Sequence, residues 1–144
     1  MVGVTVAVGC TTIDPGPTFV VPNQTFNEDY FYCVVEPQLI FGKGCGDQNG
    51  SNANCHYNSS AVSGMPLQNH PPVDCAGEKP TGAVTLGSPA KSNYTSVSLN
   101  MSRDYLTAAI YVRPTSNLAH PVAPYVYPTD DPVVDVIRTW AQKP

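Results

Sequence analysis

The chain has 144 residues and a formal net charge of −4 at pH 7, which suits one small domain with a tail. Its seven Lys and Arg residues are scattered, which argues against a nucleic-acid-binding surface and against a polybasic membrane patch. Fifteen Pro, 11 Gly and only 12% charged residues indicate a loop-rich chain with few long helices. Together with the helical patterns described below, this composition predicts a mainly α fold with much irregular loop. Five Cys in a loop-rich chain of this length favour an oxidising compartment or a bound cofactor.

The N-terminal segment has two interpretations. Met1–Gly9 is small and apolar and runs into Cys10, as at the end of a lipoprotein signal, which would make Cys10 a lipid-bearing residue of an exported protein. The valines at even positions also alternate with small residues, as in a strand. Residues 11–25 are Pro-rich and read as an extended tether. We therefore expect a signal remnant or strand over 1–10, a tether over 11–25 and one folded domain over 26–144.

The first predicted helix begins at Asn27, which is followed by two acidic residues and an apolar stripe of helical spacing. Pro37 should kink this helix or force it to re-form, and Gly42 and Gly44 should end it. Residues 46–54 read as a polar loop, and residues 63–91 as mostly irregular chain.

Two more helices are predicted towards the C-terminus. One should lie near residues 102–111, begun by Asn100 or Ser102 and closed before Pro114. The pattern of the other is clearer, because Asp131 is a suitable cap and Pro132 then takes the first helical position. Its apolar face is expected to contain Val134, Ile137, Trp140 and Ala141.

The motif with the most chemical content is Cys45, nine intervening residues, and then Cys55-His56. Covalent haem attachment needs two thiols for the two vinyl groups and a His directly after the second Cys, usually with two residues between the Cys. A longer insert can loop outwards at little extra entropic cost. The residues alone also allow a Cys45–Cys55 disulfide without haem, or a zinc site that adds Cys75 or His70 to these three.

Residues 30–39, followed by Cys45 and Cys55-His56, resemble the start of cytochrome c-like domains of bacterial envelope proteins, and residues 133–140 resemble their C-terminal helix. The resemblance covers roughly Phe26 to Trp140. It implies N- and C-terminal helices packed around one haem c, bound to Cys45 and Cys55, with His56 as the proximal iron ligand. His120-Pro121 stands where relatives have Met-Pro, which implies His120 as the distal ligand. His70, Met65 and Met101 are the alternatives for that position.

The same resemblance leaves Cys33 and Cys75 to form a disulfide that would pin the Pro-rich middle of the chain to the first helix. It implies an electron carrier and not an enzyme, located in the periplasm or at the cell surface, with redox proteins or copies of itself as partners and with a lipid anchor at Cys10. The alternative is a non-haem envelope module, held by disulfides, that binds a partner or builds an assembly. Its N-terminal segment would then be a strand donated to a neighbour.

Overall fold

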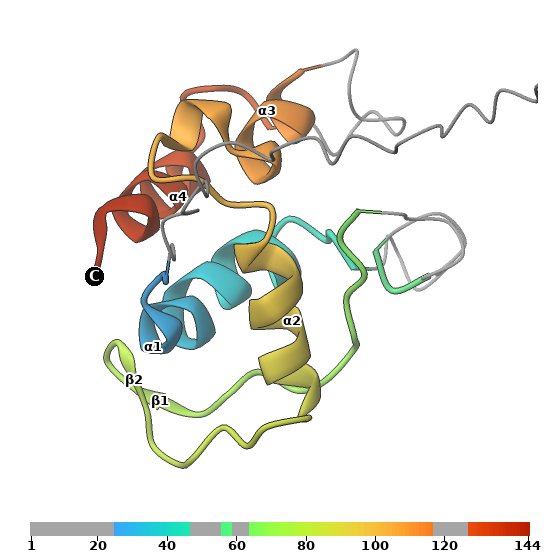
Figure 1. The fold of residues 1–144 in the computed structure, drawn as a ribbon, viewed down its shortest axis with the longest axis vertical. Helices are drawn as coiled ribbons and strands as arrows, with labels where there is room; N and C mark the ends of the chain where they lie inside the picture. Colours follow the sequence, from blue (N-terminus) through green and yellow to red (C-terminus); the bar gives the residue numbers. More distant parts are fainter. Residues whose placement is uncertain (1–24, 47–55, 59–63, 117–126) are drawn as a thin grey trace, which may run out of the picture.

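The computed structural model describes residues 25–46, 56–58, 64–116 and 127–144 (Figure 1). The described part contains helices and irregular loops, as expected, and one small two-stranded hairpin, which was not expected. Segments 1–10 and 11–25, predicted as a signal or strand and a tether, lie outside it except for Thr25. The elements are α1 (Glu28–Tyr30), η1 (Phe31–Phe41), β1 (Cys75–Ala76), β2 (Lys79–Pro80), α2 (Pro89–Ser98), η2 (Tyr105–Thr107), α3 (Ala109–Thr115) and α4 (Pro132–Gln142).

The first helix begins where the sequence predicts, because the Asn27 side chain accepts a hydrogen bond from the Tyr30 N–H at 2.8 Å. Pro37, expected to kink the helix or force it to re-form, lies inside a helix that changes type. The α-turn widens into the π-helix η1, which continues through Pro37 to Phe41. In this wider helix the Gly42 N–H bonds to the carbonyl of Pro37, five residues back, at 2.9 Å. A proline is therefore accommodated by a change of helical pitch rather than by a break.

The second helix differs from the prediction. α2 occupies residues 89–98, within and beyond the stretch expected to be irregular, with Ser88 as its cap and Pro89 in its first turn. The helix expected at 102–111 is replaced by the single turn η2 and by the short α3, which includes Pro114. Pro114 has no N–H for the carbonyl of Ile110, one turn earlier. The buried Tyr127 hydroxyl donates to that carbonyl at 2.7 Å instead, so the helix carries no unsatisfied group there.

The C-terminal helix α4 is confirmed. The Asp131 carboxylate accepts a hydrogen bond from the Val133 N–H at 3.0 Å, and Pro132 takes the first position. The predicted apolar face is buried, and Trp140 and Ile137 are completely shielded from solvent.

The core forms where α4 packs on η1, with α2 on the other side of the first helix (Figure 1). The Trp140 ring lies 5.3 Å from the Phe26 ring, 5.4 Å from Phe31 and 6.4 Å from Tyr94, measured between centroids. Its Nε1–H donates to the carbonyl of Asn27 at 2.8 Å. One side chain therefore joins the start of the first helix, α2 and α4.

Candidate functional site

The structure brings Cys45 and His56 together. Cys45 follows η1 and continues its hydrogen bonding, with its N–H on the carbonyl of Ile40 at 2.9 Å. The His56 N–H donates to the Cys45 carbonyl at 3.1 Å, and the Tyr57 N–H donates to the Gly46 carbonyl at 3.0 Å. These two hydrogen bonds hold the chain before the insert against the chain after it. The expectation that the long insert leaves the two ends of the motif adjacent therefore agrees with the described residues, while Cys55 and residues 47–54 lie outside them.

Gly46 makes this junction possible. A Cβ atom added at Gly46 would lie 2.1–2.4 Å from three atoms of the Tyr57 ring. The ring therefore packs directly on the glycine backbone, and no other residue type fits there without displacing the ring.

Replacing Gly46 with Ala should lower the free energy of unfolding by about 1–3 kcal/mol, the usual cost of overpacking. Denaturation in urea provides the measurement. Gly82→Ala is a matched control, since a Cβ there meets nothing within 4 Å. The loss should shrink when Tyr57 is replaced by Ala in the same chain. If Gly46→Ala lowers the free energy of unfolding no more than Gly82→Ala does, the Tyr57 ring does not pack on Gly46 as described.

The His56 imidazole is held by a backbone carbonyl. Its Nδ1 lies 2.7 Å from the carbonyl oxygen of Met65, and the Leu67 N–H donates to the His56 carbonyl at 2.9 Å. A carbonyl oxygen only accepts, so Nδ1 carries the proton and, in the neutral ring, Nε2 carries the lone pair. Histidines that bind metals are oriented in this way, with one nitrogen bonded to a carbonyl and the other presented as a ligand.

Cys45 lies half-buried beside an aromatic wall. Its Sγ is 3.3 Å from the carbonyl oxygen of Leu39. The buried Tyr127 lies close by, and burial raises the pKa of its hydroxyl well above the ordinary value, with smaller contributions from Cys45 and Asp131. Tyr127 therefore stays neutral, and its hydroxyl donates to the carbonyl of Ile110.

The other proposed ligands have different outcomes. His120, Cys55 and Cys10 lie outside the described residues, so the distal ligand, the second thioether and the lipid site stay predictions. Met101 lies in the core and Met65 packs against it.

His70 is not placed as an iron ligand. Its Nδ1 lies 2.7 Å from the carbonyl oxygen of Pro71, and its Nε2 lies 3.0 Å from Oε1 of Glu36. Both ring nitrogens thus have hydrogen-bond partners within the described residues, and the choice between His120 and His70 as the distal ligand stays a prediction.

The zinc alternative loses support in the described residues. Cys75 is bonded to Cys33 and has no thiolate to offer, and the histidine proposed in its place bonds to Glu36. Nowhere in residues 25–46, 56–58, 64–116 and 127–144 do three His, Cys, Asp or Glu side chains gather as a metal site would need.

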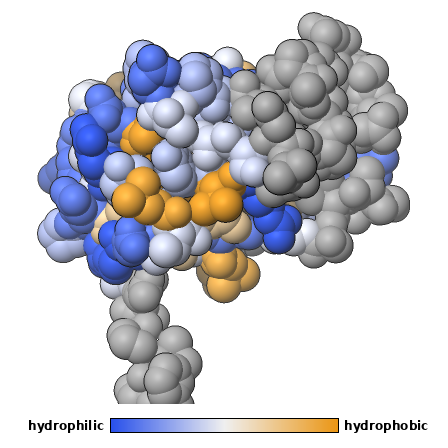
Figure 2. All heavy atoms as spheres, turned by 90° about the horizontal axis from the view of Figure 1, so that it is seen from above, coloured by the Kyte–Doolittle hydropathy of each residue, from blue (hydrophilic) through white to orange (hydrophobic). Residues whose placement is uncertain are grey.

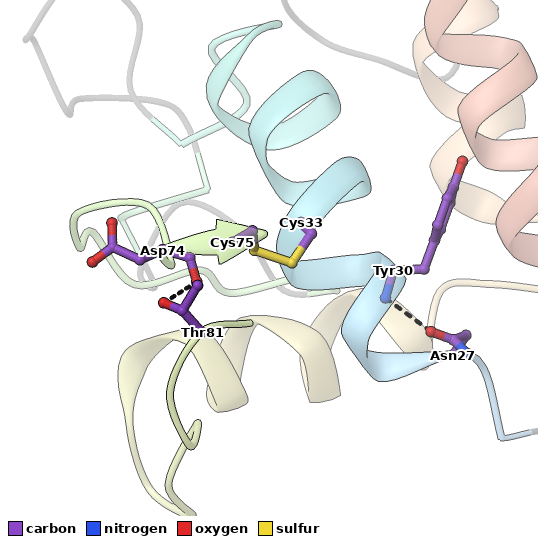
Figure 3. Close-up of a disulfide and its surroundings, with 6 residues drawn as sticks. All are labelled: Asn27, Tyr30, Cys33, Asp74, Cys75 and Thr81. Carbon is purple, nitrogen blue, oxygen red and sulfur yellow. Dashed lines mark hydrogen bonds between the residues drawn. A yellow bond between two sulfur atoms is a disulfide. The ribbon is translucent and has the colours of Figure 1, made fainter. Parts of the chain in front are cut away.

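The expected disulfide between Cys33 and Cys75 is present and joins η1 to β1, with the two Cα atoms 5.8 Å apart (Figure 3). The hairpin that presents Cys75 is closed by Thr81, whose N–H and hydroxyl both donate to the carbonyl of Asp74. The turn uses Gly77, whose φ of +65° is in the left-handed region. The bridge therefore ties the Pro-rich middle of the chain to the first helix.

The sequence reasoning missed a buried polar cluster. Glu36, in the middle of η1, and Asn93, in α2, are both completely buried, and the Asn93 side-chain amide donates to Glu36 Oε1 at 2.9 Å. A signal was present, because Glu36 stands inside an apolar stripe, four residues after Tyr32 and four before Ile40. A carboxyl group at such a position has to find partners inside the protein.

Within the described residues, no helix combines the length and the apolar character needed to cross a lipid bilayer. Comparisons of the chain with family models, with curated proteins and with solved structures returned no match.

Proposed function

We propose that this protein transfers electrons through one haem c, attached to Cys45 and Cys55 and ligated by His56. The observation that carries the proposal is the junction itself: the His56 backbone is bonded to Cys45, while Nδ1 of its imidazole lies 2.7 Å from the Met65 carbonyl oxygen, which fixes the orientation of the ring. A Cys beside a His with a fixed tautomer fits the donor set that covalent haem requires.

The residues would act as follows. Each thiol adds across one vinyl group, its sulfur bonding to one carbon and its hydrogen moving to the other, so attachment needs no oxidant or reductant. His56 and His120 would hold the iron of the haem between them, which would leave it no position for a substrate. The bound haem supplies a one-electron couple whose potential should be lower than that of a His/Met pair.

Two further features support a cytochrome c-like arrangement in an exported protein. The first and last helices of the domain pack on each other through Phe31 and Trp140, as the resemblance implies. The Cys33–Cys75 bridge is of the kind that persists in the periplasm or outside the cell. A lipid on Cys10 would then tether the domain to a membrane.

One face suits contact with a redox partner or a second copy of the chain. Figure 2, seen from the side of α3, shows apolar side chains gathered in the middle of this face. Among the described large apolar residues of η2 and α3, Leu106 is 53% exposed and Val112 is 39% exposed. Exposed apolar groups of this kind are typical of contact surfaces.

The test is haem attachment in a bacterial host that exports the chain and carries out cytochrome c maturation. We expect the denatured protein to keep haem colour and the added mass on a gel. Replacing Cys45 and Cys55 together with Ser should abolish both signals. The matched control replaces Cys33 and Cys75 with Ser and should keep them, provided that it folds.

A colourless wild-type protein with a mapped Cys45–Cys55 disulfide would refute the haem proposal. It would favour the second candidate, a non-haem envelope module that binds a partner. The specific observation behind that candidate is the Cys33–Cys75 bridge, because a second bridge at the junction would complete a disulfide-held scaffold.

A further inference from the structure

We propose that Glu36, His70 and Asn93 form a proton-sharing latch, which clamps the chain segment 65–70 between η1 and α2 and thereby positions His56. Of the two measurements proposed below, only the reduction potential of the haem rests on the proposed function. The other, amide exchange, concerns the polypeptide alone.

The latch joins three separate parts of the chain in the interior. Glu36 and Asn93 are completely buried, and the His70 side chain is 8% exposed. Glu36 Oε1 accepts a hydrogen bond from the Asn93 amide at 2.9 Å and lies 3.0 Å from His70 Nε2. The Phe41 ring covers the imidazole at 5.6 Å between centroids. A polar contact so well screened from water is worth more than one at the surface.

The geometry fixes the number of protons in the latch. His70 Nδ1 faces the Pro71 carbonyl, which only accepts, so Nδ1 carries a proton. One further proton must then lie between His70 Nε2 and Glu36 Oε1, since two bare lone pairs would repel each other. The pair is therefore either a neutral acid with a neutral imidazole or a carboxylate with an imidazolium, and both forms contain the same proton.

A continuous set of hydrogen bonds runs from the latch to His56. Asn93 holds Gln68 at both backbone groups: its Oδ1 accepts from the Gln68 N–H at 2.7 Å, and its Nδ2 donates to the Gln68 carbonyl at 3.0 Å. The adjacent Leu67 N–H donates to the His56 carbonyl, and the Met65 carbonyl accepts from the His56 imidazole. Displacement of segment 65–70 would therefore disturb the bond that sets the tautomer of His56.

The surroundings determine how pH acts on the latch. Burial raises the pKa of Glu36, while the Asn93 amide and His70 oppose that effect, and Glu36 Oε2 has no hydrogen-bond partner within the described residues. The neighbouring Tyr32, on η1, stays neutral because burial and Glu28 raise its pKa. On α2 the nearby cation, Lys91, is paired with Glu28 at 2.5 Å.

The sign of the pH effect follows because Glu36 has a higher pKa in the folded protein than in the unfolded chain. The contribution of Glu36 to stability is complete below its ordinary pKa of 4.5 and is lost as the pH rises through the raised value. The latch should therefore loosen towards alkaline pH, by about tenfold in its closing equilibrium for each pH unit by which the pKa is raised.

The experiment compares the wild type with Glu36→Gln, which keeps the shape of the side chain but does not ionise. Amide exchange at Leu67 and Gln68, expressed as protection factors from pH 4.5 to 8, should fall with pH in the wild type and stay level in the variant. Glu78→Gln is the matched control, because Glu78 is an exposed partner of Lys143 on the surface, and it should follow the wild type. If Glu36→Gln does not fold, His70→Gln takes its place: it leaves Glu36 able to ionise but removes a group that lowers its pKa, so the fall in protection should remain and move to higher pH.

The haem-loaded protein gives the second readout. The reduction potential should change with pH in the wild type over the range where protection is lost, and should not do so in Glu36→Gln. Equal pH profiles of protection in the wild type and the variant would overturn the latch, whether or not haem is attached. A pH-dependent protection that disappears in Glu36→Gln on a chain without haem would uphold the latch while the proposed function fails.

Discussion

Replacing Trp140 with Ala should lower the free energy of unfolding by about 3–5 kcal/mol, the usual cost of deleting a large aromatic side chain from a core. The Trp140 side chain is completely buried and contacts rings from the start of the first helix, from η1 and from α2. Domains of this size have a total free energy of unfolding of only about 5–15 kcal/mol, so the variant should lose a large part of its stability. Denaturation in urea, followed by far-ultraviolet circular dichroism, measures the loss.

Two further variants separate the contributions of the ring. Trp140→Phe keeps an aromatic group but removes one of the two donors to the Asn27 carbonyl, which still accepts from the Phe31 N–H at 3.2 Å, so it should cost about 0.5–1.5 kcal/mol from that source. Arg138→Ala on the same helix removes an exposed pair with Asp135 and should change stability by less than about 0.5 kcal/mol. A Trp140→Ala variant as stable as Arg138→Ala would show that α4 does not pack on the first helix as described.

Removing the Cys33–Cys75 bridge should cost about 4 kcal/mol, the loop-entropy value for a bridge of this span. The bridge closes a loop with a sequence separation of 42 residues. The hairpin it holds contains only two short strands and buries little apolar surface, so few other contacts would keep it against η1.

The measurement uses the double variant Cys33→Ala/Cys75→Ala in urea denaturation. Amide exchange near Thr81 should rise more than exchange in α4, because the hairpin loses its attachment while the main core remains. The wild type treated with a reductant is the matched control and should behave as the double variant does. An unchanged midpoint in the double variant would mean that the bridge does not restrain the unfolded chain.

The parts of the fold that follow local rules were predictable from the sequence. Asn27 and Asp131 start helices because their side chains reach backbone N–H groups one turn ahead, and this depends only on neighbouring residues. The apolar face of α4 has a helical period that needs no knowledge of its partner.

The errors occurred where distant partners outweigh local preference. The helix near 102–111 was expected to close before Pro114, but α3 includes this proline, because the Tyr127 hydroxyl compensates for the N–H that it lacks. Nothing in the sequence indicated that the helix around Pro37 would be a π-helix. α2 was missed because its sequence is rich in Ser, Thr and Asn, and its buried Asn93 is stabilised by Glu36 and Gln68 from elsewhere in the chain.

The sequence indicated which residues would form the candidate site, but not the contacts that hold them in place. The Cys45 and Cys55-His56 spacing led us to expect that the two ends of the motif meet, and the described part, Cys45 and His56, does meet. The carbonyl that orients His56 belongs to Met65, and a backbone oxygen leaves no mark in a sequence. The latch that holds this segment involves residues from three separate parts of the chain, which only the folded structure brings together.

The bond from Tyr127 to Ile110 also has a consequence for how this protein can vary. Residues 117–126, which include the proposed iron ligand His120, begin just after α3 and end at a tyrosine fastened to the same helix. Both attachment points of this stretch are thus fixed independently of what lies between them. Substitutions between positions 117 and 126 should therefore leave the packing of α3 unchanged as long as Tyr127 is kept, because the hydroxyl that satisfies the Ile110 carbonyl lies outside that range.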